Sequence, residues 1–253
     1  MLRGLLQAAR ARYGPTVAMA TSPQRFYEGK NPRELPLYTL AEAARVVRVH
    51  PQTLGTWVLG RSYPTRGGEK SWSPLIRPAD RKGRRLSFAN LVELHVLSVL
   101  RGKRIRVERI RTATRFIQSA MRTEHPLADV DMRTDCVDLY VDYLGKLVNA
   151  SSGQVPLRFL VERYLERIER DEQGLASRLY PLTRDDGSSS KAVLIDPCFR
   201  FGRPILAHTN VETAVVADRF FAGESTADLA ADFALDETSV EEAIRFESQL
   251  RAA

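Results

Sequence analysis

Two short helical patterns joined by a tight break constrain the fold of this chain more than any other feature. Thr39 and Glu42 have the spacing of a capping box, in which an N-cap hydroxyl and a carboxylate three residues later satisfy the first N–H groups of a helix. Pro51 begins a second helical pattern, at the position where a missing N–H costs nothing. Helices this short cannot form a core alone, so we expect a helix-turn-helix over residues 39–58. An ordinary helical hairpin is the alternative.

The second helix would bury one side and expose the other. Leu54, Trp57 and Val58 fall on the side expected to pack against the core. The opposite side would be free to enter a DNA major groove, with Gly55 among its exposed positions. We expect five residues in and beside these helices to contact DNA: Thr39, His50, Gln52, Thr53 and Thr56.

The segment over residues 59–86 predicts a β-hairpin wing with a loose tip, because Tyr63, Trp72, Leu75 and Ile76 stand there among glycines and prolines. Cations beside a recognition helix are typical of a surface that contacts phosphate. The DNA-binding residues predicted in this segment are Arg61, Tyr63, Arg66, Lys70, Arg77, Arg81, Lys82, Arg84 and Arg85. Ser87 then caps a helix that runs to Leu100, and a second helix follows over residues 105–117. His95, inside the first of these, is expected to be a core or interface histidine rather than a metal ligand.

Charge is divided unevenly along the 253 residues. Residues 1–125 carry 24 Lys and Arg against 8 Asp and Glu, and residues 126–253 carry 14 against 23, so their net charges are +16 and −9. The basic half indicates a polyanionic partner such as nucleic acid. A generally basic surface is the alternative.

Several classes of protein are not expected from this composition. Cys136 and Cys198 are too few for a disulfide scaffold or a cysteine-built zinc site. No apolar run approaches the roughly 18–20 residues of a membrane-spanning helix. The sequence has no Gly-rich phosphate loop, paired-carboxylate motif or histidine–metal constellation, so we expect no enzyme, no metal and no cofactor. A reduced cytoplasmic compartment fits best.

The middle of the chain predicts a smaller structural unit. Residues 138–143 alternate polar and apolar, and with residues 146–149 they predict a β-hairpin. Residues 156–170 predict an amphipathic helix that turns Arg167 and Arg170 toward water. Two short strands are then expected, at residues 192–195 and 201–206.

Three helical patterns complete the chain: one over residues 213–222, one capped by Ser225 or Thr226, and one capped by Asp236. Residues 205–253 carry three arginines against ten acids, a net charge of −7, which repels phosphate and favours a protein partner. Phe220 and Phe221 are adjacent, about 100° apart on a helix, so one can fill the core and the other can serve an interface. The alternative is a wide apolar stripe on this helix that buries both phenylalanines.

Two stretches resemble the MerR-type DNA-binding domain, and more closely its variant in VapB-like antitoxins of bacterial toxin–antitoxin pairs. They read LYTLAEAARVVRVHPQTLGTWV and, after the wing, RRLSFANLVELHVLSVLRGKRIRVERIRTA. A third resembles the small helix-turn-helix-like C-terminal domain of the same antitoxins, and reads IDPCFRFGRPILAHTNVETAVVADRFFAGESTADLAADFALDETSVEEAIR. Gly55 and Thr56 stand where relatives often carry an arginine, and Ala207 and Asn210 replace a common glycine and arginine.

The resemblance implies a bacterial antitoxin that binds operator double-stranded DNA through residues 38–104 and represses its own operon. It also implies neutralisation of a PIN-type ribonuclease toxin, and operator symmetry makes a homodimer or higher oligomer the default. A MerR-like transcriptional regulator that responds to a ligand, without a toxin partner, is the alternative.

The expected fold is mainly α with some β structure (α+β), divided into four parts. Residues 1–20 superficially resemble a targeting peptide, but Gln7 and Arg10 break their apolar stretch, so a loose arm is expected; Met19 is an alternative start. The parts are a flexible N-terminal arm at 1–36, a MerR-like winged helix-turn-helix at 37–125, a central hairpin–helix region at 126–190, and an acidic helix-turn-helix-like domain at 191–253.

Overall fold

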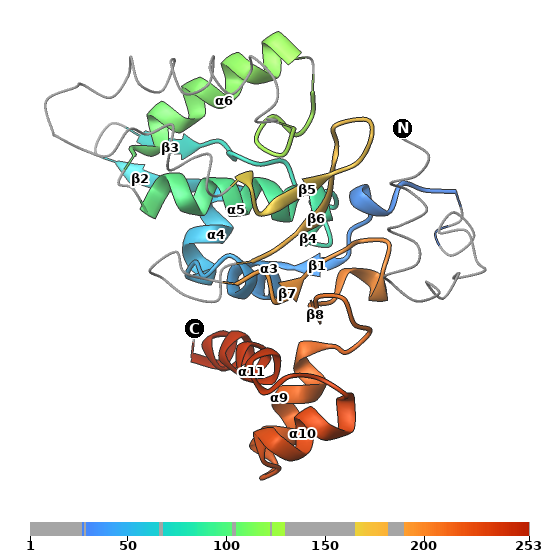
Figure 1. Cartoon of the computed structure of the whole chain (residues 1–253). Helices are drawn as coiled ribbons and strands as arrows, with labels where there is room; N and C mark the ends of the chain where they lie inside the picture. Colours follow the sequence, from blue (N-terminus) through green and yellow to red (C-terminus); the bar gives the residue numbers. More distant parts are fainter. Residues whose placement is uncertain are drawn as a thin grey trace, which may run out of the picture. The chain divides into compact units, whose positions relative to one another are not determined.

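The computed structural model describes residues 27, 29–65, 68–102, 105–121, 123–129, 165–181 and 190–252. The chain divides into two units, Met1–Asn31 and Pro32–Ala253. In the first unit, the Lys30 N–H donates to the Tyr27 carbonyl at 2.8 Å. The second unit combines helices with small antiparallel sheets (Figure 1). This confirms the α+β fold with an N-terminal helix-turn-helix that the sequence predicts.

The helices and strands of the second unit are short. The helices are α3 Leu40–Val46, α4 Pro51–Leu59, α5 Phe88–Gly102, α6 Val107–Met121, α9 Thr213–Phe221, α10 Thr226–Phe233 and α11 Glu237–Ala252, with 3-10 turns η1 Pro32–Glu34 and η2 Arg200–Gly202. The strands are β1 Tyr38–Thr39, β2 Arg61–Thr65, β3 Gly68–Trp72, β4 Arg85–Leu86, β5 Ile168–Arg170, β6 Ala176–Leu179, β7 Val193–Leu194 and β8 Ile205–Leu206. They pair antiparallel as β1–β4, β2–β3, β5–β6 and β7–β8.

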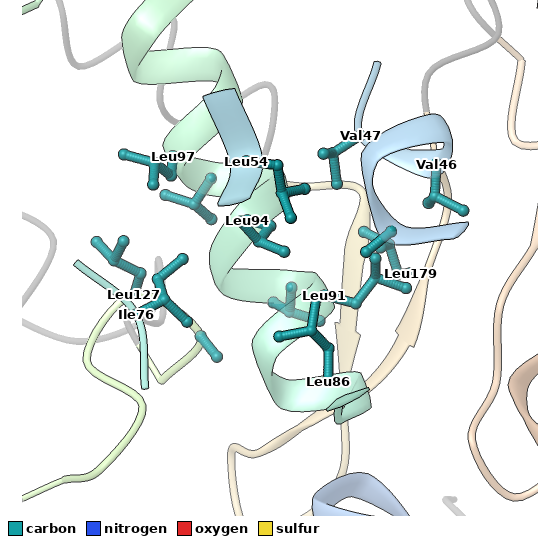
Figure 2. Close-up of a cluster of buried hydrophobic side chains, with 14 of the residues drawn as sticks. Val46, Val47, Leu54, Ile76, Leu86, Leu91, Leu94, Leu97, Leu127 and Leu179 are labelled. Atoms are coloured by element: carbon teal, nitrogen blue, oxygen red, sulfur yellow. The ribbon is translucent and has the colours of Figure 1, made fainter. Parts of the chain in front are cut away.

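Helix α5 is the centre of the main hydrophobic core. Twelve of its 15 residues are buried, so it is covered on all sides, as expected of a helix inside a core rather than at a surface. Leu91, Leu94 and Leu97 of α5 belong to the same core as Leu54 of α4 (Figure 2). The same core includes Leu179 of β6, so the helix-turn-helix shares its apolar interior with the hairpin of β5 and β6.

The predicted amphipathic helix over residues 156–170 is wrong at its C-terminal end. Ile168–Arg170 form strand β5, which pairs with Ala176–Leu179, and the Asp171 Oδ1 accepts N–H groups at Gln173 and Leu175 in the turn between them. The predicted hairpin over residues 138–149 lies outside the described residues, as do residues 156–164.

Two arginines that the sequence predicts to face water from that helix instead donate hydrogen bonds to backbone carbonyl groups. Arg167 is 7% exposed, and its guanidinium donates to the carbonyls of Tyr180, Pro181 and Ser190. Arg170 is half-buried and donates to the carbonyl of Ala128 at 2.8 Å. A helical periodicity cannot reveal these roles, because the Tyr180, Pro181, Ser190 and Ala128 acceptors are distant in sequence.

The predicted strand over residues 201–206 is shorter than expected, and only Ile205–Leu206 pair with β7. Arg200, Phe201 and Gly202 have φ values of 48°, 54° and 72° and form a left-handed turn instead. The buried Tyr38 hydroxyl donates to the Gly202 carbonyl at 3.0 Å, and a Cβ on Gly202 would lie 2.0 Å from that hydroxyl. Glycine is therefore needed at 202 both for its φ and for this close approach.

The C-terminal helices α9, α10 and α11 surround a separate small core that includes Val216, Leu229 and Val240. Ser225 caps α10 by accepting the Asp228 N–H at 3.1 Å, and Asp236 accepts the Ser239 N–H at 2.8 Å before α11. The three helical patterns and these two caps are confirmed. In the part of the chain that the structure describes, no helix combines the length and apolarity that crossing a membrane requires.

Candidate nucleic-acid interface

The helix-turn-helix is held together by local hydrogen bonds that its sequence specifies. The Thr39 hydroxyl accepts the Glu42 N–H at 3.1 Å, and the Glu42 carboxylate accepts the Thr39 N–H at 2.7 Å, completing the capping box of α3. In the turn that follows α3, Arg48 takes a left-handed φ of 57°, and Pro51 then starts α4. The tight turn over residues 47–50 thus sets the direction in which α4 leaves α3.

Helix α4 divides its residues as expected of a recognition helix. Leu54, Trp57 and Val58 are buried, with exposures of 5% or less, whereas Gln52 and Thr53 are exposed. The polar side of α4 therefore faces outward from the core. Gly55 and Thr56 are half-buried at its margin, and a Cβ added at Gly55 would meet nothing within 4 Å.

Three of the residues predicted around α4 use part of their hydrogen-bonding capacity inside the protein. The Thr39 hydroxyl donates to Glu42 at 2.8 Å, His50 Nδ1 accepts the Gln52 N–H at 3.2 Å, and the Thr56 hydroxyl donates to the Gln52 carbonyl at 3.0 Å. The side chains of Gln52 and Thr53 have no such bond among the described residues. These two side chains are therefore the best placed on α4 to read a base edge.

The wing is an antiparallel hairpin of β2 and β3 in which Arg61 pairs with Trp72 and Tyr63 with Lys70. The Trp72 indole N–H donates to the Tyr63 hydroxyl at 3.1 Å, and Arg61 is exposed. Gly60 separates α4 from the wing with a φ of 79°, and a Cβ there would lie 2.4 Å from the Trp72 carbonyl oxygen. Arg66 at the tip and the side chain of Lys70 lie outside the described residues.

The hairpin does not extend to residue 86, so five of the predicted cations lie beyond it. Asp80 and Arg85 exchange two backbone hydrogen bonds of 3.0 and 2.9 Å, and Asp80 Oδ1 accepts two further N–H groups within the loop. We call residues 80–85 the basic turn. Its four cations are exposed: Arg81, Lys82, Arg84 and Arg85.

Arg77 and Arg85 lie outside the hairpin, next to other elements of the fold. Arg77 is exposed, and its carbonyl accepts the Asn90 side-chain amide at 2.8 Å. Arg85 donates to the Leu37 carbonyl at 3.4 Å and lies near Glu42, at the start of α3. The predicted DNA-binding residues thus lie on several parts of the fold: β1, α4 with the turn before it, the hairpin, and the segment from Arg77 to Arg85.

Arg111 of α6 is a residue that the sequence did not single out. Its guanidinium donates to the Ser73 hydroxyl at 2.9 Å and to the Pro74 carbonyl at 3.1 Å, which anchors the base of the wing to α6. Burial lowers the pKa of Arg111, and nearby Arg115 adds to this. Many arginines surround it in the sequence, and no local signal distinguishes it from those that face water.

A buried polar network also escaped sequence-based prediction. Glu93 of α5 is 2% exposed, and its carboxylate accepts hydrogen bonds from Asn90 at 3.3 Å and from His125 at 3.0 Å. The other imidazole nitrogen of His125 lies 2.9 Å from Glu34 of η1. Asn90 in turn accepts the Ala79 N–H at 3.0 Å, so the network reaches the segment that follows the wing.

Burial and hydrogen bonding act in opposite directions on this network. Burial raises the pKa of the Glu93 carboxyl, and the hydrogen bonds from His125 and Asn90 only partly offset this. Burial would lower the pKa of His125, but hydrogen bonds to Glu34 and Glu93 raise it to about 10. Hydrogen bonding to His125 lowers the pKa of Glu34. His125 is therefore protonated at neutral pH.

The C-terminal helices carry acidic side chains and two neighbouring phenylalanines. Phe220 packs against the small core, whereas Phe221 is 46% exposed, and their ring centroids are 5.6 Å apart in an edge-on arrangement. Arg219, next to Phe220 in the sequence, is paired with Glu224 and Asp232. One ring is thus in the core and the other at the surface.

Two family models match parts of the chain. Residues 36–114 match a family described as "Putative DNA-binding HTH domain", and residues 193–246 match a family described as "Protein of unknown function (DUF433)". The first covers α3, α4, the wing and α5, and the second covers the strands and helices of the acidic end.

Among the described residues, no group of three or more His, Cys, Asp or Glu is arranged to hold a metal ion.

Relatives from Mycobacterium tuberculosis resemble the chain over most of its length. "Putative antitoxin VapB45" is 27% identical over 229 residues, which is 83% of this chain and 93% of the relative. "Uncharacterized protein Rv2308" is 24% identical over 86% of this chain and 92% of its own. The X-ray crystal structure of Rv2018 matches with a TM-score of 0.61 and 26% identity, covering 83% of this chain and 98% of that one.

Proposed function

We propose that this chain is an antitoxin that binds operator DNA, represses its own operon and neutralises a PIN-type ribonuclease toxin. The observation that carries the proposal is that the exposed polar face of α4 is followed directly by a cationic hairpin and the basic turn. The similarity to a protein named as an antitoxin supports the toxin-directed part.

Within this proposal, the DNA contacts divide into two kinds. Gln52 and Thr53 read base edges, because they are the exposed polar side chains of α4. The hairpin and the basic turn contact phosphates, which fix the protein on the duplex without reading its sequence. The acidic C-terminal helices serve protein association, since their charge opposes phosphate binding.

The toxin-directed part is tested in cells by inducing each reading frame adjacent to this gene, with and without this chain. We expect growth arrest when one of these frames is expressed alone, and recovery when it is expressed with this chain. Purified chain should also shift DNA from its own upstream region. If growth does not recover although the purified chain shifts the DNA, the chain is a plain transcriptional regulator and not an antitoxin.

Arg61→Ala and Arg84→Ala are expected to weaken binding to specific and random DNA by similar factors. Each neutralised phosphate contributes a slope of about −0.9 to log K against log salt, so each variant should reduce the slope by about 1. Fluorescence anisotropy over a salt series measures both quantities. Arg203→Ala is the control, because Arg203 is an exposed arginine of the acidic end that pairs with Glu212. Loss of specific binding alone in the Arg61 variant would contradict a phosphate role.

Phe221→Ala is expected to lower the oligomeric state of the chain, because exposed aromatic side chains often anchor interfaces. Light scattering measures the change. Val215→Ala is the matched control, since Val215 is also exposed on α9 but on a different side of the helix. A point variant is needed because Phe246 of α11 is part of the main core, so removal of the C-terminal helices would disturb that core. An unchanged oligomer with lost toxin binding would assign this surface to toxin capture.

A further inference from the structure

A cavity of about 460 Å³ lies between the segment that follows the wing, helix α5 and helix α6. Pro74–Arg81 provide one wall, Glu93 of α5 another, and Thr114 of α6 a third. Its volume falls within the range of about 300–1,000 Å³ that is usual for small-molecule sites. Nothing in the proposed DNA or toxin binding uses the inside of this cavity.

The buried end of the cavity has hydrogen-bond acceptors but few donors. Thr114 is 7% exposed, and its hydroxyl oxygen has no hydrogen-bond partner among the described residues. Glu93 is 2% exposed, and both of its hydrogen bonds from described residues go to Oε2. The buried lining also includes Pro78 and Pro126, which have no N–H to donate.

A ligand with an ammonium group would satisfy this end of the cavity. An ammonium group donates three hydrogen bonds and accepts none, which complements a carboxylate and a hydroxyl oxygen. The charges agree, because protonated His125 lies between the carboxylates of Glu93 and Glu34 and leaves this trio with a net negative charge when both are ionised. A buried hydroxyl without a partner is costly, so a bound donor would also remove that cost.

The outer end of the cavity favours a negatively charged group. Arg77 and Arg81 line it with exposed side chains, and guanidinium groups bind carboxylates in a bidentate geometry. Exposed Gln118 and Glu124 complete this end. The cavity thus presents acceptors inside, and two cations and the Glu124 carboxylate outside.

From this arrangement we propose that the cavity binds a small zwitterion of the amino-acid class, with its ammonium group against Glu93 and Thr114 and its carboxylate toward Arg77 and Arg81. The bound ligand would touch the segment that follows the wing, which is hydrogen-bonded to the recognition helix. In that segment the Leu75 and Ile76 N–H groups donate to the Trp57 carbonyl of α4 at 2.7 and 3.2 Å. Its carboxylate would also compete with DNA phosphate for the two arginines.

The test is calorimetric titration of the full chain, without DNA, with each of the common L-amino acids in turn. At least one should bind the wild-type chain, and its decarboxylated amine and its deaminated acid should each bind at least about tenfold more weakly, because each lacks one of the two charged ends. Absence of binding by every amino acid, or equal binding of either singly charged analogue, would overturn the proposal.

Thr114→Val tests the inner end of the site, since valine keeps the shape of threonine and removes the hydroxyl. We expect about tenfold weaker binding, with no decrease in Tm, because no described partner of that hydroxyl is lost. Thr112→Val is the matched control on the same helix, where the exposed hydroxyl donates to the Glu108 carbonyl at 2.9 Å. Unchanged binding in the Thr114 variant, or a lower Tm than in the Thr112 variant, would overturn the assignment of this hydroxyl to a ligand.

Discussion

Replacing Gln52 and Thr53 together by alanine is expected to lower the affinity for the operator by about 2–6 kcal/mol, at roughly 1–3 kcal/mol for each base contact. Affinity for random DNA should change little, because that binding comes from phosphate contacts made elsewhere. Both side chains are exposed on α4, so the free energy of unfolding should also change little. Anisotropy titrations of the operator and a scrambled duplex, at one salt concentration, measure the difference.

Thr238→Ala is the control for this double variant, since Thr238 is an exposed threonine in the first turn of an acidic helix far along the chain. It should leave both affinities unchanged. Equal loss of operator and random binding in the Gln52 and Thr53 variant would mean that α4 contacts phosphate rather than bases. Base reading would then belong to the wing or the basic turn.

Replacing His125 by glutamine is expected to lower the free energy of unfolding by about 2–3 kcal/mol near neutral pH. Removing one partner of a buried ion pair costs about 3–5 kcal/mol, and the partial exposure of His125 reduces this. The variant leaves the Glu93 carboxylate, which is 2% exposed, without its cation. Urea unfolding of both proteins over a range of pH measures the effect.

The sign of the pH dependence follows from the raised pKa of His125, about 10 in the folded chain against about 6.5 for an unperturbed histidine. A group whose folded pKa is raised contributes stability that is complete below the unfolded value and is lost as pH rises through the folded one. The gap between wild type and variant should therefore narrow between about pH 6.5 and 10. A gap that stays constant over this range would show that His125 contributes through shape rather than charge.

Glu93→Gln and the double variant complete a thermodynamic cycle for this pair. If the two side chains stabilise the fold through their contact, the double variant should lose less than the sum of the single losses. The cycle also separates this pair from Glu34, which contacts the opposite nitrogen of the imidazole.

Features that the sequence specified correctly depend on contacts within one turn of helix. The capping box of Thr39 and Glu42, the helix start at Pro51 and the caps at Ser225 and Asp236 each join residues at most three positions apart. The burial of Leu54 in α4 also follows from local periodicity. Such signals are readable in a single sequence because the partners are near neighbours.

Only the tertiary structure decided features whose partners are distant in sequence. Residues 168–170 have the periodicity of a helix but pair with Ala176–Leu179, because a backbone ladder and the burial of Arg167 outweigh local helix propensity. From the sequence alone, nothing distinguishes Asn90, Glu93 and His125 from ordinary surface residues. In the structure α5 is enclosed on all sides, and burial makes the hydrogen bonds of these residues obligatory. The sequence by itself thus determined the two helices of the helix-turn-helix and the caps of α3, α10 and α11, whereas the network that holds the segment following the wing depends on non-local packing.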